Sequence, residues 1–263
     1  MIIISHRGNG FNHQENSFPA FSEAIKNGFS IEIDIHLSKD KVPFIIHDAD
    51  IKSVLSGKGK VNGLFSKEIE KYHYRGNPQL RLVRLEEVLE LCKQFNSSQS
   101  KIFIHIKNIN EPHIIPTCVS LVKRYKLEEK CFLFAVDGMD VPLIKHVKKL
   151  NTNIKTGLYL SENSKNFTKR KFKIADFIWV DEVNTEWFSE DMSQLAHKLK
   201  KKIHAVSPEI IPESKFANNY KQRWRDIKKM GFDGICTDYP YELQQYNTKS
   251  KDNFPQNLTK KFI

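Results

Sequence analysis

The sequence lacks the features that mark several classes of protein. No apolar run among its 263 residues approaches the roughly twenty residues of a membrane-spanning helix, and the opening Met1-Ile2-Ile3-Ile4 is too short for the core of a secretory signal. The first apolar run begins almost at the first methionine, without a leader before it, so we expect a cytoplasmic location. We find no internal repeat and no linker long enough to divide the chain, which favours a single domain.

Cysteine is also scarce. Four cysteines are scattered along the chain, none in a CxxC pair, and each lies in or beside an apolar segment: Cys92, Cys118, Cys131 and Cys236. Zinc sites and disulfide frameworks usually show paired or regularly spaced cysteines. We therefore expect four buried free thiols.

Negative charge is in deficit, because 42 Lys and Arg residues face 31 Asp and Glu residues and leave a net charge of +11. Such an excess raises the hypothesis of binding to nucleic acid or to an anionic membrane. The basic runs at 169–173, 198–202 and 260–261 accompany no nucleic-acid-binding motif. We favour a solvated basic face and expect no nucleic-acid partner. Peripheral contact with an anionic membrane and the oligomeric state stay open.

The chain does contain a regular alternation of strand-like and helix-like segments. Nine apolar segments predict strands, and helix-period segments lie between most of them; the strands are expected at 2–5, 30–37, 43–47, 101–106, 131–136, 154–159, 176–180, 203–207 and 234–237, and the helices include 85–95, 114–125, 141–150, 186–199 and 215–230. This alternation implies an α/β fold with a parallel sheet, and the length suits one barrel of eight strands.

Nine strand candidates are one too many for such a barrel. We assign 43–47 as the returning arm of a β-hairpin at 30–47, because no helix separates it from the preceding strand. The predicted fold is a single TIM-type (β/α)8 barrel over residues 1–245. We expect a small insertion at about 48–80 near the barrel mouth and a polar, loosely held tail over residues 246–263.

Charged side chains interrupt the first three apolar runs. His6-Arg7-Gly8 ends the first, Glu32-Ile33-Asp34 lies in the second, and His47-Asp48 ends the third. An unpaired ion in a buried strand costs several kcal/mol, so these residues need a function. Strand side chains alternate, so Glu32 and Asp34 point the same way about 7 Å apart. Two such carboxylates favour a divalent cation between them.

The hairpin turn predicts the position of His47. A turn centred between Lys39 and Asp40 pairs position 32 with position 47, which places His47 across from Glu32.

The ordered set of motifs resembles the glycerophosphodiester phosphodiesterase family over roughly residues 2–245. The matching strings are His6-Arg7-Gly8, Glu15-Asn16-Ser17, Glu32-Ile33-Asp34, Lys39-Asp40, His47-Asp48, Val83-Arg84-Leu85-Glu86-Glu87 and Gly231-Phe232-Asp233-Gly234. The resemblance implies a TIM-type barrel that uses one divalent metal ion. It also implies hydrolysis of a small glycerol-type phosphodiester to an alcohol and glycerol phosphate.

The resemblance further implies roles for individual residues. His6 and His47 would form the acid/base pair, Arg7 and Lys107 would hold the substrate phosphate, and Glu32 and Asp34 would bind the metal. Which histidine is the base stays open. So does the nucleophile, either water or a glycerol hydroxyl that would release a cyclic phosphate.

The third metal ligand departs from the family. Relatives have a glutamate where this chain has His105, two residues before Lys107. An imidazole can bind a divalent metal but shifts the preference away from calcium towards softer ions such as manganese or zinc. The identity of the ion, magnesium, calcium or manganese, stays open. We favour His105 as the ligand. The alternative ligands are Glu209, Asp181 and Glu182, which are expected near strand ends together with Asp137 and Asp238.

Two other functions fit the same fold. If His105 cannot hold the metal, the chain would bind phosphodiesters without hydrolysing them. It could also be a related phosphodiesterase or lyase that acts on a lysolipid or a phosphate-linked glycan, since the sequence does not identify the alcohol.

Overall fold

Eight parallel strands close into a barrel in the computed structural model, which describes residues 1–9, 13–95, 100–136, 138–150, 153–162, 164 and 169–252. Each strand pairs with the next around the ring, and the first pairs with both the second and the last. The strands are β1 (Ile2–His6), β2 (Ser30–Leu37), β4 (Ile102–Ile106), β5 (Cys131–Ala135), β6 (Lys155–Leu160), β7 (Phe177–Val180), β8 (Lys202–Val206) and β9 (Gly234–Thr237). The predicted TIM-type barrel is confirmed.

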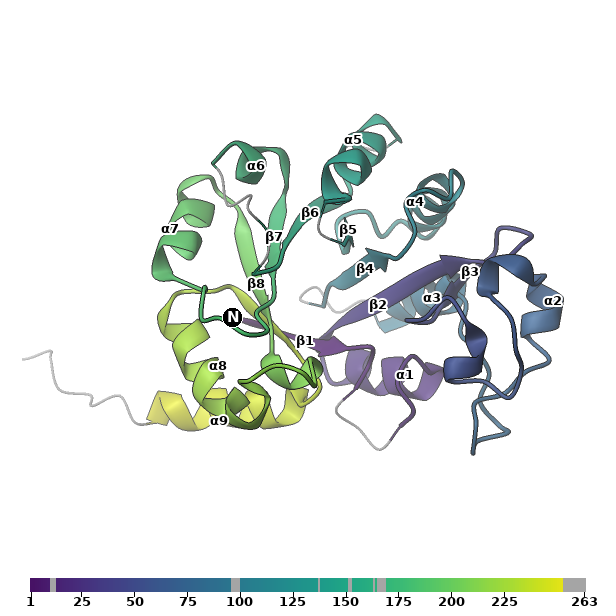
Figure 1. Cartoon of the computed structure of the whole chain (residues 1–263), viewed down its shortest axis with the longest axis horizontal. Helices are drawn as coiled ribbons and strands as arrows, with labels where there is room; N and C mark the ends of the chain where they lie inside the picture. The colour runs from purple at the N-terminus through teal and green to yellow at the C-terminus, as the bar shows by residue number, and fades with distance from the viewer. Residues whose placement is uncertain are drawn as a thin grey trace, which may run out of the picture.

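Helices surround the barrel (Figure 1). They are α1 (Phe18–Lys26), α3 (Leu85–Phe95), α4 (Ile114–Tyr125), α5 (Asp140–Leu150), α6 (Lys169–Ile174), α7 (Glu190–Lys198), α8 (Tyr220–Lys229) and α9 (Pro240–Asp252). In α3, Leu85, Val88, Leu89 and Cys92 are buried on one face at the spacing of a helix that packs on a sheet. The predicted bounds hold for α3 and α4. The helix expected over 215–230 begins only at Tyr220, after a 3₁₀ turn at Ala217–Asn219.

Large side chains fill the barrel interior. Ile4, Phe103, Phe134, Phe177 and Trp179 form one buried cluster, in which the rings of Phe103 and Trp179 lie 5.2 Å apart. Tight aromatic packing closes the barrel below its mouth, by which we mean the carboxyl ends of the strands. The mouth therefore rests on a rigid apolar floor.

The hairpin is present, but its register differs from the prediction. β3 (Pro43–Ile45) runs antiparallel to β2 and pairs Ile35 with Ile45, so the turn is centred on Asp40. Lys41 adopts a left-handed conformation with φ of 67°, which adds one residue to the turn. The ladder ends at Ile45, and the expected pairing of Glu32 with His47 is wrong.

The insertion at about 48–80 packs around its own small core. It contains two 3₁₀ turns (Ile51–Ser53 and Val61–Gly63) and the short helix α2 (Ser66–Ile69). Ile51, Leu55, Val61, Ile69 and Tyr74 are buried together with residues of β3. This core joins the insertion to the hairpin beside the barrel mouth.

The C-terminal segment is more ordered than the sequence predicts. Helix α9 continues through Asp252, so the tail expected from residue 246 is helical over 246–252, and residues 253–263 lie outside the described part. Tyr246 packs against the core, with its ring 6.3 Å from that of Trp224. This apolar contact explains why the helix extends beyond residue 245.

Two expectations from composition can be compared with the structure. Cys92, Cys118, Cys131 and Cys236 are all buried and free, as predicted. Among the described residues, we find no helix with the length and apolar character needed to cross a bilayer.

Candidate active site

A cavity of about 410 Å³ opens at the barrel mouth. Its walls include His6 at the end of β1, Glu32 and Asp34 on β2, and His105 on β4. Parallel pairing sets His6 beside Glu32 and Asp34 beside His105. All seven site residues predicted from the sequence line this one cavity, since Arg7, His47 and Lys107 complete the set. Barrels of this type carry their chemistry at this end.

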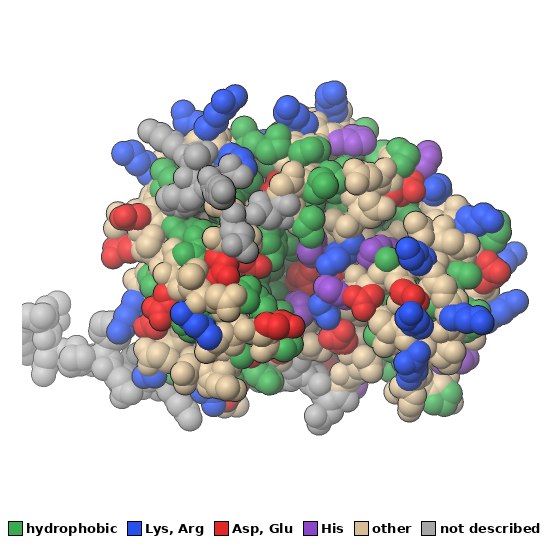
Figure 2. Space-filling view, viewed as in Figure 1, with side chains coloured by type: hydrophobic (Ala, Val, Ile, Leu, Met, Phe, Trp, Pro, Cys, Tyr) green, Lys and Arg blue, Asp and Glu red, His purple; other side chains and the backbone are tan. Residues whose placement is uncertain are grey.

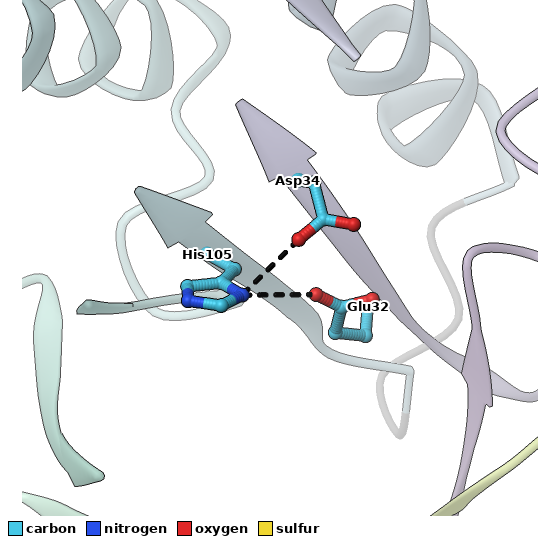
Figure 3. Close-up of side chains that lie close together, drawn as sticks. All are labelled: Glu32, Asp34 and His105. Atoms are coloured by element: carbon cyan, nitrogen blue, oxygen red, sulfur yellow. Dashed lines mark ion pairs between the residues drawn. The ribbon is translucent and has the colours of Figure 1, made fainter. Parts of the chain in front are cut away.

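Glu32, Asp34 and His105 converge on one point (Figure 3). The Nδ1 atom of His105 lies 3.1 Å from Oδ1 of Asp34 and 3.8 Å from Oε1 of Glu32. One ligand atom from each residue falls within 4.8 Å of the others. The His105 ring stacks on Phe134 at 4.6 Å, which fixes its orientation. In the described part of the chain, this is the one group of three such side chains able to hold a metal ion.

The two carboxylates are electrostatically unequal. Burial and the charge of Asp34 raise the pKa of Glu32 to about 8. Burial also opposes ionisation of Asp34, but the His105 hydrogen bond and the charge of Lys107 outweigh it and hold its pKa well below the usual value. The buried Oε2 atom of Glu32 has no hydrogen-bond partner among the described residues. A cation beside Glu32 would satisfy this atom and keep the carboxylate ionised at neutral pH.

Arg7 reaches the acids from a tight turn. Its φ of 52° and the φ of 74° at Gly8 are left-handed. A Cβ at Gly8 would come within 3.0 Å of Ala20, so only glycine fits. The turn directs the Arg7 guanidinium to Asp34 (3.3 Å) and to Glu15 (3.1 Å). A strained backbone of this kind is common at functional sites.

Lys107 is the second cation of the cavity. Its Nζ atom lies 3.4 Å from Oδ1 of Asp34, and its side chain is 15% exposed. Arg7 is similarly accessible at 18%. Both cations therefore contact the Asp34 carboxylate and face the space in which an anion could bind.

His6 is held by Asp238, which the sequence predicts only to lie near a strand end. The Nδ1 atom of His6 lies 2.8 Å from Oδ1 of Asp238, which also accepts a hydrogen bond from Asn9. Burial opposes protonation, but the bond to Asp238 and the charge of Glu32 outweigh it and raise the pKa of His6. Glu209 accepts hydrogen bonds from the Thr237 hydroxyl and from the backbone of Asp238 (3.3 Å), so it supports the same turn.

His47 has the opposite environment. Its side chain is 42% exposed at the cavity rim, and its Nδ1 atom lies 2.8 Å from Asp48. Partial burial and the nearby cations Lys107 and Arg7 lower the pKa of His47. His36, which matches no motif, contacts the His47 carbonyl oxygen through Nε2 at 3.1 Å. The alternation of side chains along the strand does not by itself predict this contact between His36 and His47.

The carboxylates of the three alternative third ligands each bind another side chain. Glu182 is fully buried in an ion pair with Arg223, and Glu209 is bound by Ser207 and Thr237. Asp181 lines the cavity, where its carboxylate accepts a hydrogen bond from the Tyr159 hydroxyl. Asp137 lies outside the described residues.

The cavity has two chemically different walls. In Figure 2, histidines, cations and acids gather on one side of the central hollow, while hydrophobic side chains line part of the other. The second wall comes from β5 to β8 and includes Phe134, Tyr159, Trp179 and Val206. The sequence alone assigns no role to Phe134 or Tyr159.

Known proteins share this sequence pattern and this fold. The model of the glycerophosphoryl diester phosphodiesterase family matches residues 6–242. A glycerophosphodiester phosphodiesterase of Bacillus altitudinis is 23% identical over 90% of this chain and 94% of its own length. One from Caldanaerobacter subterraneus is 26% identical over 60% of this chain, and the match spans 65% of that protein.

Solved structures agree on the fold. A phosphodiesterase of Oleispira antarctica, in complex with the product sn-glycerol-3-phosphate, superposes with a TM-score of 0.75 at 18% identity and covers 94% of this chain and 97% of its own. A glycerophosphodiester phosphodiesterase of Agrobacterium tumefaciens gives 0.70 at 19% identity, with 92% and 98% covered. Since the family model spans nearly the whole chain, this chain belongs to the glycerophosphoryl diester phosphodiesterase family.

Proposed function

We propose that this chain hydrolyses glycerophosphodiesters to an alcohol and glycerol phosphate. The observation that carries the proposal is the single cavity that gathers two histidines, two cations and the Glu32–Asp34–His105 group at the barrel mouth. A phosphodiester carries one negative charge, which Arg7 and Lys107 can bind through charge-assisted hydrogen bonds. The family membership supports the same reaction.

The residues present fit a divalent metal ion. Glu32, Asp34 and His105 offer two carboxylates and one imidazole whose ligand atoms lie within 4.8 Å of one another. The Oε2 atom of Glu32 has no hydrogen-bond partner among the described residues, so its lone pairs are available to a cation. A bound divalent ion would supply Lewis-acid stabilisation of the charged phosphate oxygens. The imidazole favours manganese or zinc over calcium, which prefers an all-oxygen site.

The histidines divide the proton transfers between them. We assign His6 as the general acid, because Asp238 and Glu32 favour its protonated form. His47 has a lowered pKa and acts as the general base. His47 accepts a proton from the attacking water, whose oxygen bonds to phosphorus. His6 donates a proton to the alcohol oxygen as its bond to phosphorus breaks.

Asp238 and Asp48 set the tautomers. Each accepts a hydrogen bond from the Nδ1 atom of its histidine at 2.8 Å. The Nε2 atom of each ring is then the atom left to exchange a proton with the substrate. The two assignments thus depend on hydrogen bonds as well as on pKa.

Single alanine variants of the two histidines test this proposal. We expect His6→Ala and His47→Ala each to lower kcat for glycerophosphocholine by at least about a hundredfold. Release of choline is measured, and phosphorus NMR identifies the second product. His113→Ala, at an exposed position, is the matched control. Full activity in either site variant would refute the acid/base assignment. A cyclic phosphate product would instead show a glycerol hydroxyl as the nucleophile.

A further inference from the structure

We propose that the wall formed by Tyr159, Trp179 and Asp181 selects a positively charged alcohol on the phosphodiester, and that a quaternary ammonium group fits it best. This inference rests on the proposed function and specifies the substrate of the same site. The wall continues into Ile211 and Glu213, which follow β8 and line the same cavity.

The barrel geometry places this wall opposite the phosphate-binding groups. Around the closed ring of strands, β6 lies across from β1 and β7 lies across from β2. His6, Glu32 and Asp34 come from β1 and β2, while Tyr159 belongs to β6 and Trp179 to β7. The two ester groups of a phosphodiester leave the phosphorus in different directions. A phosphate held by Arg7 and Lys107 therefore sends one of its substituents over this wall.

The buried part of the wall is apolar. Trp179 and Phe134 are 2% and 1% exposed, and their rings pack 4.8 Å apart. Val206 and Ile211 add aliphatic surface to the same cavity. A hydroxyl-rich group packed against these four side chains would replace few of its hydrogen bonds to water. A trimethylammonium group has no hydrogen-bond donor to satisfy, and its methyl groups can pack on aromatic carbon.

The wall carries two carboxylates, those of Asp181 and Glu213. Asp181 is 8% exposed, and its carboxylate is fixed by the hydroxyl of Tyr159. The Trp187 indole also donates to the backbone oxygen of Asp181 at 2.7 Å, which anchors this strand end. Glu213 adds an exposed carboxylate to the rim. Carboxylates next to aromatic rings attract a cation and disfavour an uncharged group of equal size.

A pair of matched substrates isolates the charge from the shape. Glycerophosphocholine and the corresponding 3,3-dimethylbutyl ester differ only in having a cationic nitrogen or a neutral carbon at the branch point. We expect kcat/KM to favour the choline ester by at least about tenfold in the wild-type chain. In Asp181→Asn we expect this ratio to fall close to one. The asparagine oxygen can still accept the Tyr159 hydrogen bond.

Two further variants complete the experiment. Asp191→Asn removes the same charge from an exposed position on α7 and should keep the wild-type ratio. Glu213→Gln, at an exposed position, should lower the ratio by a smaller factor and keeps the test valid if Asp181→Asn does not fold. A wild-type ratio of one would overturn the proposal. So would an equal loss for both esters in Asp181→Asn, because the wall would then bind the glycerol half.

The failure of this inference can be distinguished from failure of the proposed function. If neither ester is hydrolysed, the function fails, and calorimetric titration of both esters into the His6→Ala variant still measures the selectivity of binding. Tighter binding of the choline ester would support the wall as a cation site. Equal affinities would refute it.

Discussion

Asp238 both orients the His6 ring and raises the pKa of His6, and its substitution tests the two effects by different measurements. Its carboxylate bonds to Nδ1 of His6 and favours the imidazolium. We expect Asp238→Asn to lower the pKa of His6 by about one unit. Because His6 must be protonated to act as an acid, the alkaline limb of the kcat profile should move to lower pH by the same amount.

The size of the effect on rate is a separate readout. Loss of the fixed tautomer should lower kcat about tenfold to a hundredfold at neutral pH. Asp191→Asn, with the same change of charge on α7, should keep the wild-type profile. A reduced kcat with an unshifted alkaline limb would show that His6 is not the acid.

We expect His105 to set the metal preference of the proposed site. His105→Glu supplies a third carboxylate, and charge count strengthens calcium binding, so calcium affinity should rise by at least about tenfold relative to manganese. Isothermal titration of both ions into metal-free protein measures this ratio without any turnover. His113→Glu changes the charge equally at an exposed position and should leave the ratio unaltered. An unchanged ratio in His105→Glu would remove His105 from the proposed ligand set.

The sequence identifies the strand residues of the site but does not indicate that Asp238 supports His6. Glu32, Asp34 and His105 stand out because they interrupt apolar runs. Asp238 lies 232 positions from His6, and only barrel closure brings the two together. No local pattern signals that pairing. Phe134 and Tyr159 could not be predicted to face the cavity, because a buried aromatic residue in a strand looks like ordinary core.

At the scale of elements, the hairpin shows how one backbone conformation changes a prediction. A hairpin was predicted here, but β3 ends at Ile45, and the left-handed Lys41 shifts the pairing by one residue. A lysine does not usually signal positive φ, as glycine or asparagine would. His47 therefore reaches the cavity from beyond the end of β3, where its contacts with His36 and Asp48 position it.

The ion pair between Arg223 and Glu182 connects α8 with the segment that follows β7. Arg223 on α8 is 5% exposed and donates two hydrogen bonds to the fully buried Glu182, which follows β7. Arg223→Met leaves that carboxylate without its partner. We expect the free energy of unfolding to fall by about 3–5 kcal/mol, measured by equilibrium urea unfolding.

A double variant tests the cause. Glu182→Met combined with Arg223→Met removes the buried charge as well as its partner, so it should recover at least half of the lost stability. A loss below about 1 kcal/mol in Arg223→Met would indicate that water or another group already compensates Glu182.

At the scale of the whole molecule, barrel closure turns scattered residues into one site. The eight barrel strands were predictable because buried parallel strands are continuous apolar runs flanked by helix-period segments. The end of α9 was not, because Tyr246 packs against a distant Trp224 while its neighbours in sequence are polar. Closure also places a cationic, metal-fitting side and an aromatic, acidic side across one cavity of about 410 Å³.

The most direct test of the central claim is hydrolysis of glycerophosphocholine by the purified chain, before and after removal of metal with EDTA. We expect release of choline and glycerol phosphate that stops with EDTA and returns when manganese is added in excess. The His6→Ala variant should stay inactive under all three conditions. Absence of turnover by the wild-type chain on any glycerophosphodiester, with any of magnesium, calcium, manganese or zinc, would contradict the account.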